Sequence, residues 1–322
     1  MSTPTTLTHL IDIASLHAGL IERLFACADY LRQQPGLPAG VAEQLRHVHA
    51  VNMFYENSTR TQLGFEVAAR QLGLHISNLQ SEQSSSVKGE SLTDTFHTLV
   101  AMGYRLFNIR HPQVGSAQQL AALAPEGVHI INAGDGVHAH PTQALADAYT
   151  MRDHFGQVAG LKVVIAGDLR HSRVARSNIA LLNLLDAAEI RLVAPPEMDL
   201  QPAPGHAAVR SYQHLEDALP GADVVMLLRI QMERMDELEI PDRETYLRQW
   251  GLTPERMRLA GADARIMHPG PLNRGLEIDG ALADGAQSLI LRQVQLGVFV
   301  RMAVMLTMLA PQQSWPQNHE SC

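Results

Sequence analysis

The sequence of 322 residues has only two cysteines, Cys27 and Cys322. They are too few and too badly placed for a disulfide framework, and no Cys/His cluster with zinc spacing accompanies them. These absences predict a protein of the reducing cytoplasm that holds no structural metal. The N-terminus also lacks a basic segment followed by an apolar run, so we expect no secretory signal peptide.

The sequence also lacks an uncharged hydrophobic run of membrane length. The longest apolar stretch, residues 289–309, contains Arg292 and Arg301, and charges at mid-span predict a buried helix and no membrane partner. The sequence has fewer basic than acidic residues, with 25 Lys and Arg and 33 Asp and Glu, for a net charge of -8. This negative charge argues against nucleic acid as a partner. A small anionic ligand stays possible, since a local arginine cluster acts well within the screening length of about 8 Å.

Short apolar runs alternate with helical patterns along the whole chain, which predicts an α/β fold of two domains, each a parallel β-sheet flanked by helices. A chain of this length is long enough for two ordinary cores. Strands are expected at 49–55, 74–79, 104–110 and 127–133, and again at 161–168, 189–195, 222–229 and 264–270.

Helices are expected where apolar residues recur at helical spacing. They include a helix through Phe65 and Leu72, a second through Ala175 and Leu182, and a long helix over residues 140–155 that bridges the halves. The boundary is placed near Tyr149, so the domains are residues 1–149 and 150–288. Residues 310–322 form a polar tail that we expect to be disordered.

Polar clusters follow the expected strands, at the end of a parallel sheet where ligands bind. The stretch STRT, Ser58 to Thr61, follows a strand and begins a helix. Free N–H groups, the helix dipole, three hydroxyls and a guanidinium converge there, which favours a phosphate. The alternative is that Ser58 is only a helix N-cap.

The other clusters of the first half are SEQSSSVKGES with Lys88, NIRHP with Arg110, and AGDGVHAHPTQ with His140 and Gln143. A mobile surface loop is the alternative for the first. His140 lies at a helix start, where it could serve as a cap or a satisfied half-buried residue. Its position beside a predicted anion site favours a functional role.

The second half contributes AGDLRHSRVARSN with Arg170, Arg173 and Arg176, LLRIQMERM with Arg229 and Gln231, and the rigid turn of MHPGPLNRG. The first of these resembles a dinucleotide-binding turn but lacks G-x-G-x-x-G. Arginines stand where glycines would let a pyrophosphate approach. A carboxylate-binding arginine is therefore the better interpretation.

Taken in order, STRT, the serine/lysine loop, IRHP, HPTQ, GDLxxSR, LRxQxER and HPGP resemble the aspartate carbamoyltransferase catalytic chain over residues 8–309. The resemblance implies transfer of a carbamoyl group from carbamoyl phosphate to L-aspartate, giving N-carbamoyl-L-aspartate and phosphate for de novo pyrimidine biosynthesis, without a cofactor. It implies a carbamoyl-phosphate-binding domain at 1–149, with helix 289–309 packing back on it, and an aspartate-binding domain at 150–288. It also implies a homotrimer with shared active sites.

Carried over residue by residue, the resemblance implies a set that binds carbamoyl phosphate: Ser58, Thr59, Arg60, Thr61, Ser86, Lys88, Arg110, His140, Gln143, Gly270 and Pro271. L-aspartate would be bound by Arg173, Arg229, Gln231 and the Lys88 of a neighbouring subunit. The residues expected to be catalytic are Arg60, Thr61, Lys88, Arg110 and His140. Ser86 is a choice among Ser84, Ser85 and Ser86, because this loop is shorter than in some members of the family.

Two other functions are alternatives to this one. Ornithine carbamoyltransferase shares STRT and HPTQ, but a His-Cys-Leu-Pro turn and an acidic Ser-Met-Gly site would be expected, whereas this chain has HPGP and an Arg/Gln pair. A catalytically silent scaffold would be expected to lose Arg60, Lys88 or His140, and all three are present. A regulatory chain or a dihydroorotase-like partner, and regulation by nucleotides, stay open.

Overall fold

The computed structural model describes residues 6–34, 36–80, 90–200, 208–231, 242–313 and 315. The chain divides into two compact units, Met1–Leu145 with Gln295–Cys322, and Ala146–Val294. Each unit contains one parallel sheet with helices on both faces, so the predicted α/β fold class is confirmed.

The first unit is built on a four-stranded parallel sheet in the order β2-β1-β3-β4. Its strands lie at or close to the predicted ranges: β1 His49–Phe54, β2 His75–Gln80, β3 Tyr104–His111 and β4 His129–Asp135. Strand β1 is buried from Ala50 to Phe54 because helices cover both faces of the sheet. This explains why its sequence is nearly continuous in apolar residues, with little alternation.

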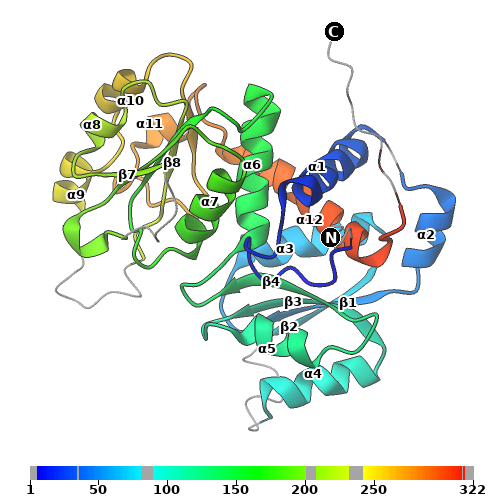
Figure 1. Cartoon of the computed structure of the whole chain (residues 1–322). Helices are drawn as coiled ribbons and strands as arrows, with labels where there is room; N and C mark the ends of the chain where they lie inside the picture. The colour runs from blue at the N-terminus through cyan, green and yellow to red at the C-terminus, as the bar shows by residue number, and fades with distance from the viewer. Residues whose placement is uncertain are drawn as a thin grey trace. The chain divides into compact units, whose positions relative to one another are not determined.

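Helices of the first unit lie on opposite faces of this sheet according to the direction in which they cross it (Figure 1). The helix α3, Thr59–Gln71, connects β1 to β2, whereas α4, Leu92–Ala101, and α5, Ser116–Leu123, lead in the opposite direction. Right-handed crossovers therefore place α3 on one face and α4 and α5 on the other. The unit also contains α1, Ala18–Gln33, and α2, Ala39–Leu45.

The C-terminal helix α12, Ile290–Leu309, returns to the first unit as expected. The guanidinium of Arg301 in α12 lies 5.3 Å from the centre of the Phe65 ring in α3. In the described part of the chain, α12 is the one helix long and apolar enough to span a membrane by length and composition. Because 67% of its most apolar window is buried, the prediction of a buried helix is confirmed.

The core of the first unit includes residues under α4 and α5. Phe96 of α4 meets Phe107 of β3 edge to face, with ring centres 4.8 Å apart. Both side chains are fully buried, and burying each contributes about 1.5–3 kcal/mol. The rest of this cluster includes Val51, Met53, Ile109, Ala117, Leu120, Val128 and Ile130.

The second unit is built on a five-stranded parallel sheet in the order β7-β6-β5-β8-β9. The strands are β5 Lys162–Ala166, β6 Glu189–Val193, β7 Val209–Tyr212, β8 Val224–Leu227 and β9 Arg265–Met267. Strand β7 was not predicted from the sequence. This edge strand, VRSY, is short and has no fully buried residue, so it lacks the apolar run by which the others were found.

Helix α6, Pro141–Phe155, spans the boundary between the units, as α12 does. The second unit also contains α7 Arg173–Leu184, the short 3-10 helix Pro196–Met198, α8 Leu215–Ala218, α9 Arg243–Gln249, α10 Pro254–Ala260 and α11 Gly280–Ala283. The predicted helices through residues 140–155 and 175–182 are therefore both present.

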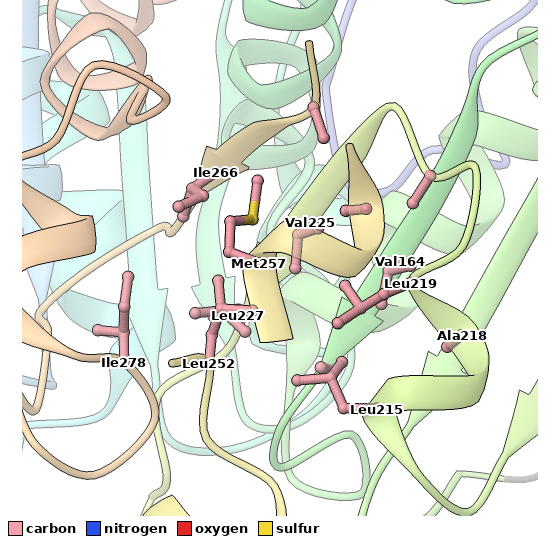
Figure 2. Packing of buried hydrophobic residues seen from close by; sticks show 14 of the residues in the cluster. Val164, Leu215, Ala218, Leu219, Val225, Leu227, Leu252, Met257, Ile266 and Ile278 are labelled. Atoms are coloured by element: carbon pink, nitrogen blue, oxygen red, sulfur yellow. The ribbon is translucent and has the colours of Figure 1, made fainter. Parts of the chain in front are cut away.

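Apolar side chains from four strands of the second sheet, β5, β6, β8 and β9, pack against α8 and α10 (Figure 2). Val164 of β5, Leu227 of β8 and Ile266 of β9 contribute to this cluster, together with Leu215 of α8 and Met257 of α10. Leu252 and Ile278, which pair in an isolated β-bridge, extend it beneath the last strand. This core fixes the carboxyl ends of β5, β8 and β9, where the loops with the predicted site residues begin.

Each sheet has one place where the direction of strand addition reverses. In the first unit it lies between β1 and β3, and in the second between β5 and β8. The loops that follow these strand pairs leave on opposite faces and create a crevice at the carboxyl end of the sheet, where open α/β sheets bind ligands. The predicted site residues can be located relative to these two crevices.

Candidate active site

The STRT stretch lies at the start of α3, directly after β1. Ser58 occupies the N-cap position, but its hydroxyl makes no capping hydrogen bond. The interpretation of Ser58 as only an N-cap is therefore not supported. The first turn of α3 contains no acidic residue, so no side chain of that turn neutralises the positive end of the helix dipole. Thr61 is buried, whereas Thr59 and Arg60 are exposed, so this helix start presents donors to an anion.

Arg110 lies at the end of β3, paired in register with Phe54 at the end of β1. The Tyr55 N–H donates to the Arg110 carbonyl at 2.8 Å, which joins the two strand ends. The Arg110 side chain donates from Nη1 to the Ala133 carbonyl at 3.2 Å, and its Nε lies 3.4 Å from Oε2 of Glu56. Arg110 is thus held beside the loop that leads into α3.

His111 follows Arg110 and adds no second cation at neutral pH. Burial lowers the pKa of His111, and the nearby Glu56 carboxylate opposes this only in part. Its Nδ1 accepts a hydrogen bond from the Gln113 N–H at 3.0 Å, which leaves the ring proton on Nε2 when His111 is neutral. The positive charge at this strand end therefore belongs to Arg110.

His140 lies immediately before α6, after a tight loop that Asp135 organises. The buried Asp135 carboxylate accepts hydrogen bonds from the N–H groups of Gly115 and Ala139, at 2.8 and 3.2 Å, and from the Asn132 side chain at 2.8 Å. This loop positions His140, whose exposed fraction is 4%, at the start of α6. Asp135 was not among the predicted site residues, although its place in AGDG after a buried strand was a usable signal.

The first unit therefore brings together most of the residues predicted to bind carbamoyl phosphate. Arg110 lies at the carboxyl end of β3, and the others follow β1 or β4: Ser58, Thr59, Arg60, Thr61, His140 and Gln143. Ser86 and Lys88, like Ser84 and Ser85, lie outside the described residues, so their roles stay predictions.

In the second unit, the loops after β5 and β8 approach each other closely at Gly167. Gly167 has φ +129°, and a Cβ atom there would lie 2.7 Å from the Leu228 carbonyl oxygen. Only glycine fits both the backbone conformation and the space. This approach brings the Arg173 loop and the Arg229 loop to the same crevice.

Gln231 is positioned by a hydrogen bond across this crevice, and Arg173 by the capped start of α7. Arg173 is the first residue of α7 and is buried, while Ser172 caps the helix by accepting from the Ala175 N–H at 3.1 Å. The Gln231 side chain donates from Nε2 to the His171 carbonyl at 3.0 Å. Arg229 is half-buried two residues earlier in the same loop. The three aspartate-binding side chains predicted in this unit thus lie on the adjacent segments that follow β5 and β8.

The side chains of the other two arginines near Arg173 donate hydrogen bonds to backbone carbonyls. Arg176 donates from Nη1 to the carbonyls of Leu169 and Arg170, at 3.3 and 3.1 Å. Arg170 donates to the carbonyl of Glu197 at 3.3 Å. These contacts agree with the choice of Arg173 as the ligand-binding arginine of the three.

Gly270 and Pro271 form a turn after β9, next to β8 in the sheet. The N–H of Gly270 donates to Nδ1 of His268 at 2.8 Å. Gly270 is half-buried and Pro271 is exposed, so the turn is accessible to a small molecule. All the second-unit residues predicted for the site therefore follow β5, β8 or β9.

Comparisons with known proteins agree with this arrangement. Residues 8–153 match the carbamoyl-P binding domain of the aspartate/ornithine carbamoyltransferase family, and residues 159–308 match its Asp/Orn binding domain. The chain is similar to Trypanosoma cruzi aspartate transcarbamoylase in complex with carbamoyl phosphate and aspartate, at 27% identity and TM-score 0.83, covering 94% of this chain and 96% of that one.

The chain is also similar to the catalytic subunit of M. jannaschii aspartate transcarbamoylase, with 31% identity and TM-score 0.81, covering 95% of this chain and 99% of that one. The resemblance inferred from the ordered motifs is therefore confirmed. This chain belongs to the aspartate/ornithine carbamoyltransferase family.

Proposed function

We propose that this chain transfers the carbamoyl group of carbamoyl phosphate to the amine of L-aspartate, giving N-carbamoyl-L-aspartate and phosphate for pyrimidine synthesis. The observation that carries the proposal is the pairing of Arg173 with the Arg229 and Gln231 loop at the β5/β8 crevice. Two guanidinium groups and an amide match the two carboxylates of aspartate. The similarity to aspartate transcarbamoylases bound to carbamoyl phosphate, aspartate and carbamoyl aspartate supports the same substrates.

The reaction requires no protein nucleophile. The aspartate amine attacks the carbamoyl carbon, a tetrahedral oxyanion forms, and the C–O bond to phosphate breaks. We assign stabilisation of that oxyanion to Thr61, Arg110 and His140, each of which can donate a hydrogen bond. Removing one such donor typically costs about 10²–10³ in rate. The leaving phosphate takes the proton of the amine, so no side chain is assigned as a general base.

An ornithine substrate fits the second unit less well. The δ-ammonium of ornithine would approach a crevice that already contains Arg173 and Arg229, and like charges repel. A direct test measures phosphate release by the purified chain with carbamoyl phosphate and either L-aspartate or L-ornithine. We expect release that depends on aspartate, whereas release that depends on ornithine, or on neither amino acid, would contradict the proposal.

We further propose that the chain acts in the cytoplasm as a homotrimer with shared active sites. An exposed apolar pair on α3 supports an interface next to the phosphate-binding residues: Leu63 is 51% exposed and Val67 is 43% exposed. Four residues apart, they lie on one face of the helix that begins with STRT. Apolar side chains that gather on a surface in this way are typical of interfaces.

The shared site can be tested with two inactive variants, Lys88→Ala and Arg60→Ala. If Lys88 completes a neighbour's site, some interfaces in hybrid trimers will pair an intact Lys88 with an intact Arg60, and activity will return on mixing. Native mass measurement establishes that hybrids have formed. Hybrid trimers with no more activity than the separate variants would mean that each chain is self-contained.

A further inference from the structure

Next to the Gly270–Pro271 turn, the second unit contains a buried pair of ionisable side chains, His268 and Glu277. They are 1% and 2% exposed, and Nε2 of His268 lies 3.4 Å from Oε1 of Glu277. Both residues belong to the stretch HPGPLNRGLE, in which the Gly270–Pro271 turn is the part predicted to contact substrate. The predicted substrate-binding residues do not include this pair.

The orientation of the His268 ring follows from its hydrogen bonds. Nδ1 accepts the N–H of Gly270 at 2.8 Å, so the ring proton must lie on Nε2, which faces the Glu277 carboxylate. Oε1 of Glu277 also accepts the N–H of Asn273 at 2.6 Å. The carboxylate thus selects the ring tautomer that leaves Nδ1 available to Gly270.

Glu277 is itself held in place by the core. Its carbonyl accepts the N–H of Leu252 at 3.0 Å, and its neighbours Leu276 and Ile278 are fully buried. The bridge between Leu252 and Ile278 belongs to the apolar cluster beneath β9 (Figure 2). The position of the carboxylate is therefore set by packing.

The main chain of His268 is tied to α7 by a second series of buried hydrogen bonds. The His268 N–H donates to Oε1 of Gln293 at 2.8 Å, and Nε2 of Gln293 donates to Oδ1 of Asp147 at 2.9 Å. Oδ2 of Asp147 accepts from Nδ2 of Asn178 at 2.8 Å. Asn178 lies in α7, the helix that begins with Arg173. The turn and the arginine helix are thus joined through side chains that are at most 3% exposed.

We propose that His268 is a positioning residue for carbamoyl transfer. Its Nδ1, oriented by Glu277, holds the Gly270 N–H so that the backbone of the Gly270–Pro271 turn meets the reacting groups. Stability alone gives no reason for this pair, because burying polar and charged side chains costs free energy that apolar residues of similar volume do not cost. Only a side chain with an acceptor at the Nδ1 position can hold the Gly270 N–H. The inference rests on the proposed function.

Two substitutions of His268 distinguish the contact made by Nδ1 from the contact made by Nε2. The carbonyl oxygen of His268→Asn can replace Nδ1 and accept the Gly270 N–H, but the side chain does not reach Glu277. The longer His268→Gln reaches Glu277 but leaves the Gly270 N–H without its acceptor. Each variant loses one contact of the pair, so we expect similar decreases in thermal stability.

We expect the turnover numbers of the two variants to differ. His268→Asn is expected to lose about threefold at most, and His268→Gln about 10–100-fold, because displacing a reacting group by about 1 Å can cost 10² in rate. Inorganic phosphate, which is assigned to the first unit, should bind both variants with wild-type affinity. Steady-state kinetics, thermal unfolding and titration with phosphate measure the three quantities.

Equal losses of turnover in the two variants, or losses that follow the melting temperature, would overturn the role of Nδ1. If His268→Gln fails to fold, the turnover number of His268→Asn alone tests the role of Nδ1. Turnover close to that of the wild type then supports the role, and a loss above about tenfold overturns it. A wild-type chain that forms no carbamoyl aspartate would instead refute the proposed function itself.

Discussion

Arg110 and Glu56 face each other across the β1/β3 crevice, with Nε 3.4 Å from Oε2 and both side chains more than four-fifths buried. Glu56 lies two residues before Ser58, so this pair connects the predicted oxyanion donor to the phosphate-binding loop. We expect Arg110→Ala to lower kcat by about 10²–10³, the typical cost of one such donor. Glu56→Gln retains an acceptor oxygen and should cost much less. Steady-state kinetics of the two variants measure this difference. Wild-type turnover in Arg110→Ala would exclude Arg110 as an oxyanion donor.

Arg229→Ala should raise the KM for aspartate strongly and leave carbamoyl phosphate binding nearly intact. Arg229 belongs to the β5/β8 crevice of the second unit, whereas the described groups around the phosphate follow strands of the first. Arg210→Ala is a matched control, since Arg210 lies on the edge strand β7 and its side chain is 65% exposed. Equal weakening of both substrates by Arg229→Ala, or an equal effect of Arg210→Ala, would contradict the assignment.

His140→Asn should keep more activity than His140→Ala. The amide can retain a hydrogen-bond donor toward the carbamoyl oxygen, while alanine cannot. This expectation follows from a role for His140 as a donor that polarises the carbamoyl group, without transfer of a proton. Because His140 is buried, circular dichroism of both variants is the necessary control. Two folded variants with equal losses would count against this role.

The N-terminal segment docks on the edge strand β4 through a pair of histidines. The Leu10 N–H donates to the Ile130 carbonyl at 2.9 Å, and the Asn132 N–H donates to the Leu10 carbonyl at 2.8 Å. Beside this bridge, Nδ1 of His9 accepts the Ile130 N–H at 3.2 Å, and Nδ1 of His129 lies 2.9 Å from the Thr8 carbonyl, to which it donates. Burial lowers the pKa of both histidines, and for His9 the neighbouring His129 lowers it further.

Docking of this segment should therefore weaken in acid. A histidine whose pKa is lower in the docked state than its ordinary 6.5 binds more protons when undocked. The stabilisation is therefore complete above about pH 6.5 and is lost as the pH falls through the lowered pKa. Hydrogen exchange of the Leu10 and Asn132 amides should accelerate, beyond the intrinsic rate, as pH drops below that value. His129→Gln should flatten this dependence, whereas substitution of the exposed His47 should not.

Much of the fold could be predicted because the sequences of buried parallel strands are nearly continuous runs of apolar residues. The exception, β7, is an edge strand with polar and half-buried residues, so its place depends on pairing with β6 and not on its own composition. The order of the strands in each sheet could also not be predicted from the hydrophobic pattern of the sequence. It depends on which crossovers pack together, and it determines where the two crevices lie.

The candidate site was predictable where one stretch concentrates donors, as in STRT. Contacts between distant segments were not. The pairing of Arg110 with Glu56 depends on the register of β1 with β3, and the bond from Gln231 to His171 depends on the approach of two loops at Gly167. The buried Asp135 and the His268–Glu277 pair likewise acquire their roles only once the chain has folded around them.

The identity of the carbamoylated product tests the central claim most directly, since phosphate release alone does not identify the nucleophile. The purified chain is incubated with ¹³C-labelled carbamoyl phosphate and equal concentrations of L-aspartate and L-ornithine in one vessel, and products are identified by mass spectrometry. The account predicts labelled N-carbamoyl-L-aspartate that depends on Arg229. Labelled citrulline as the main product, or the formation of labelled carbon dioxide alone, would contradict it.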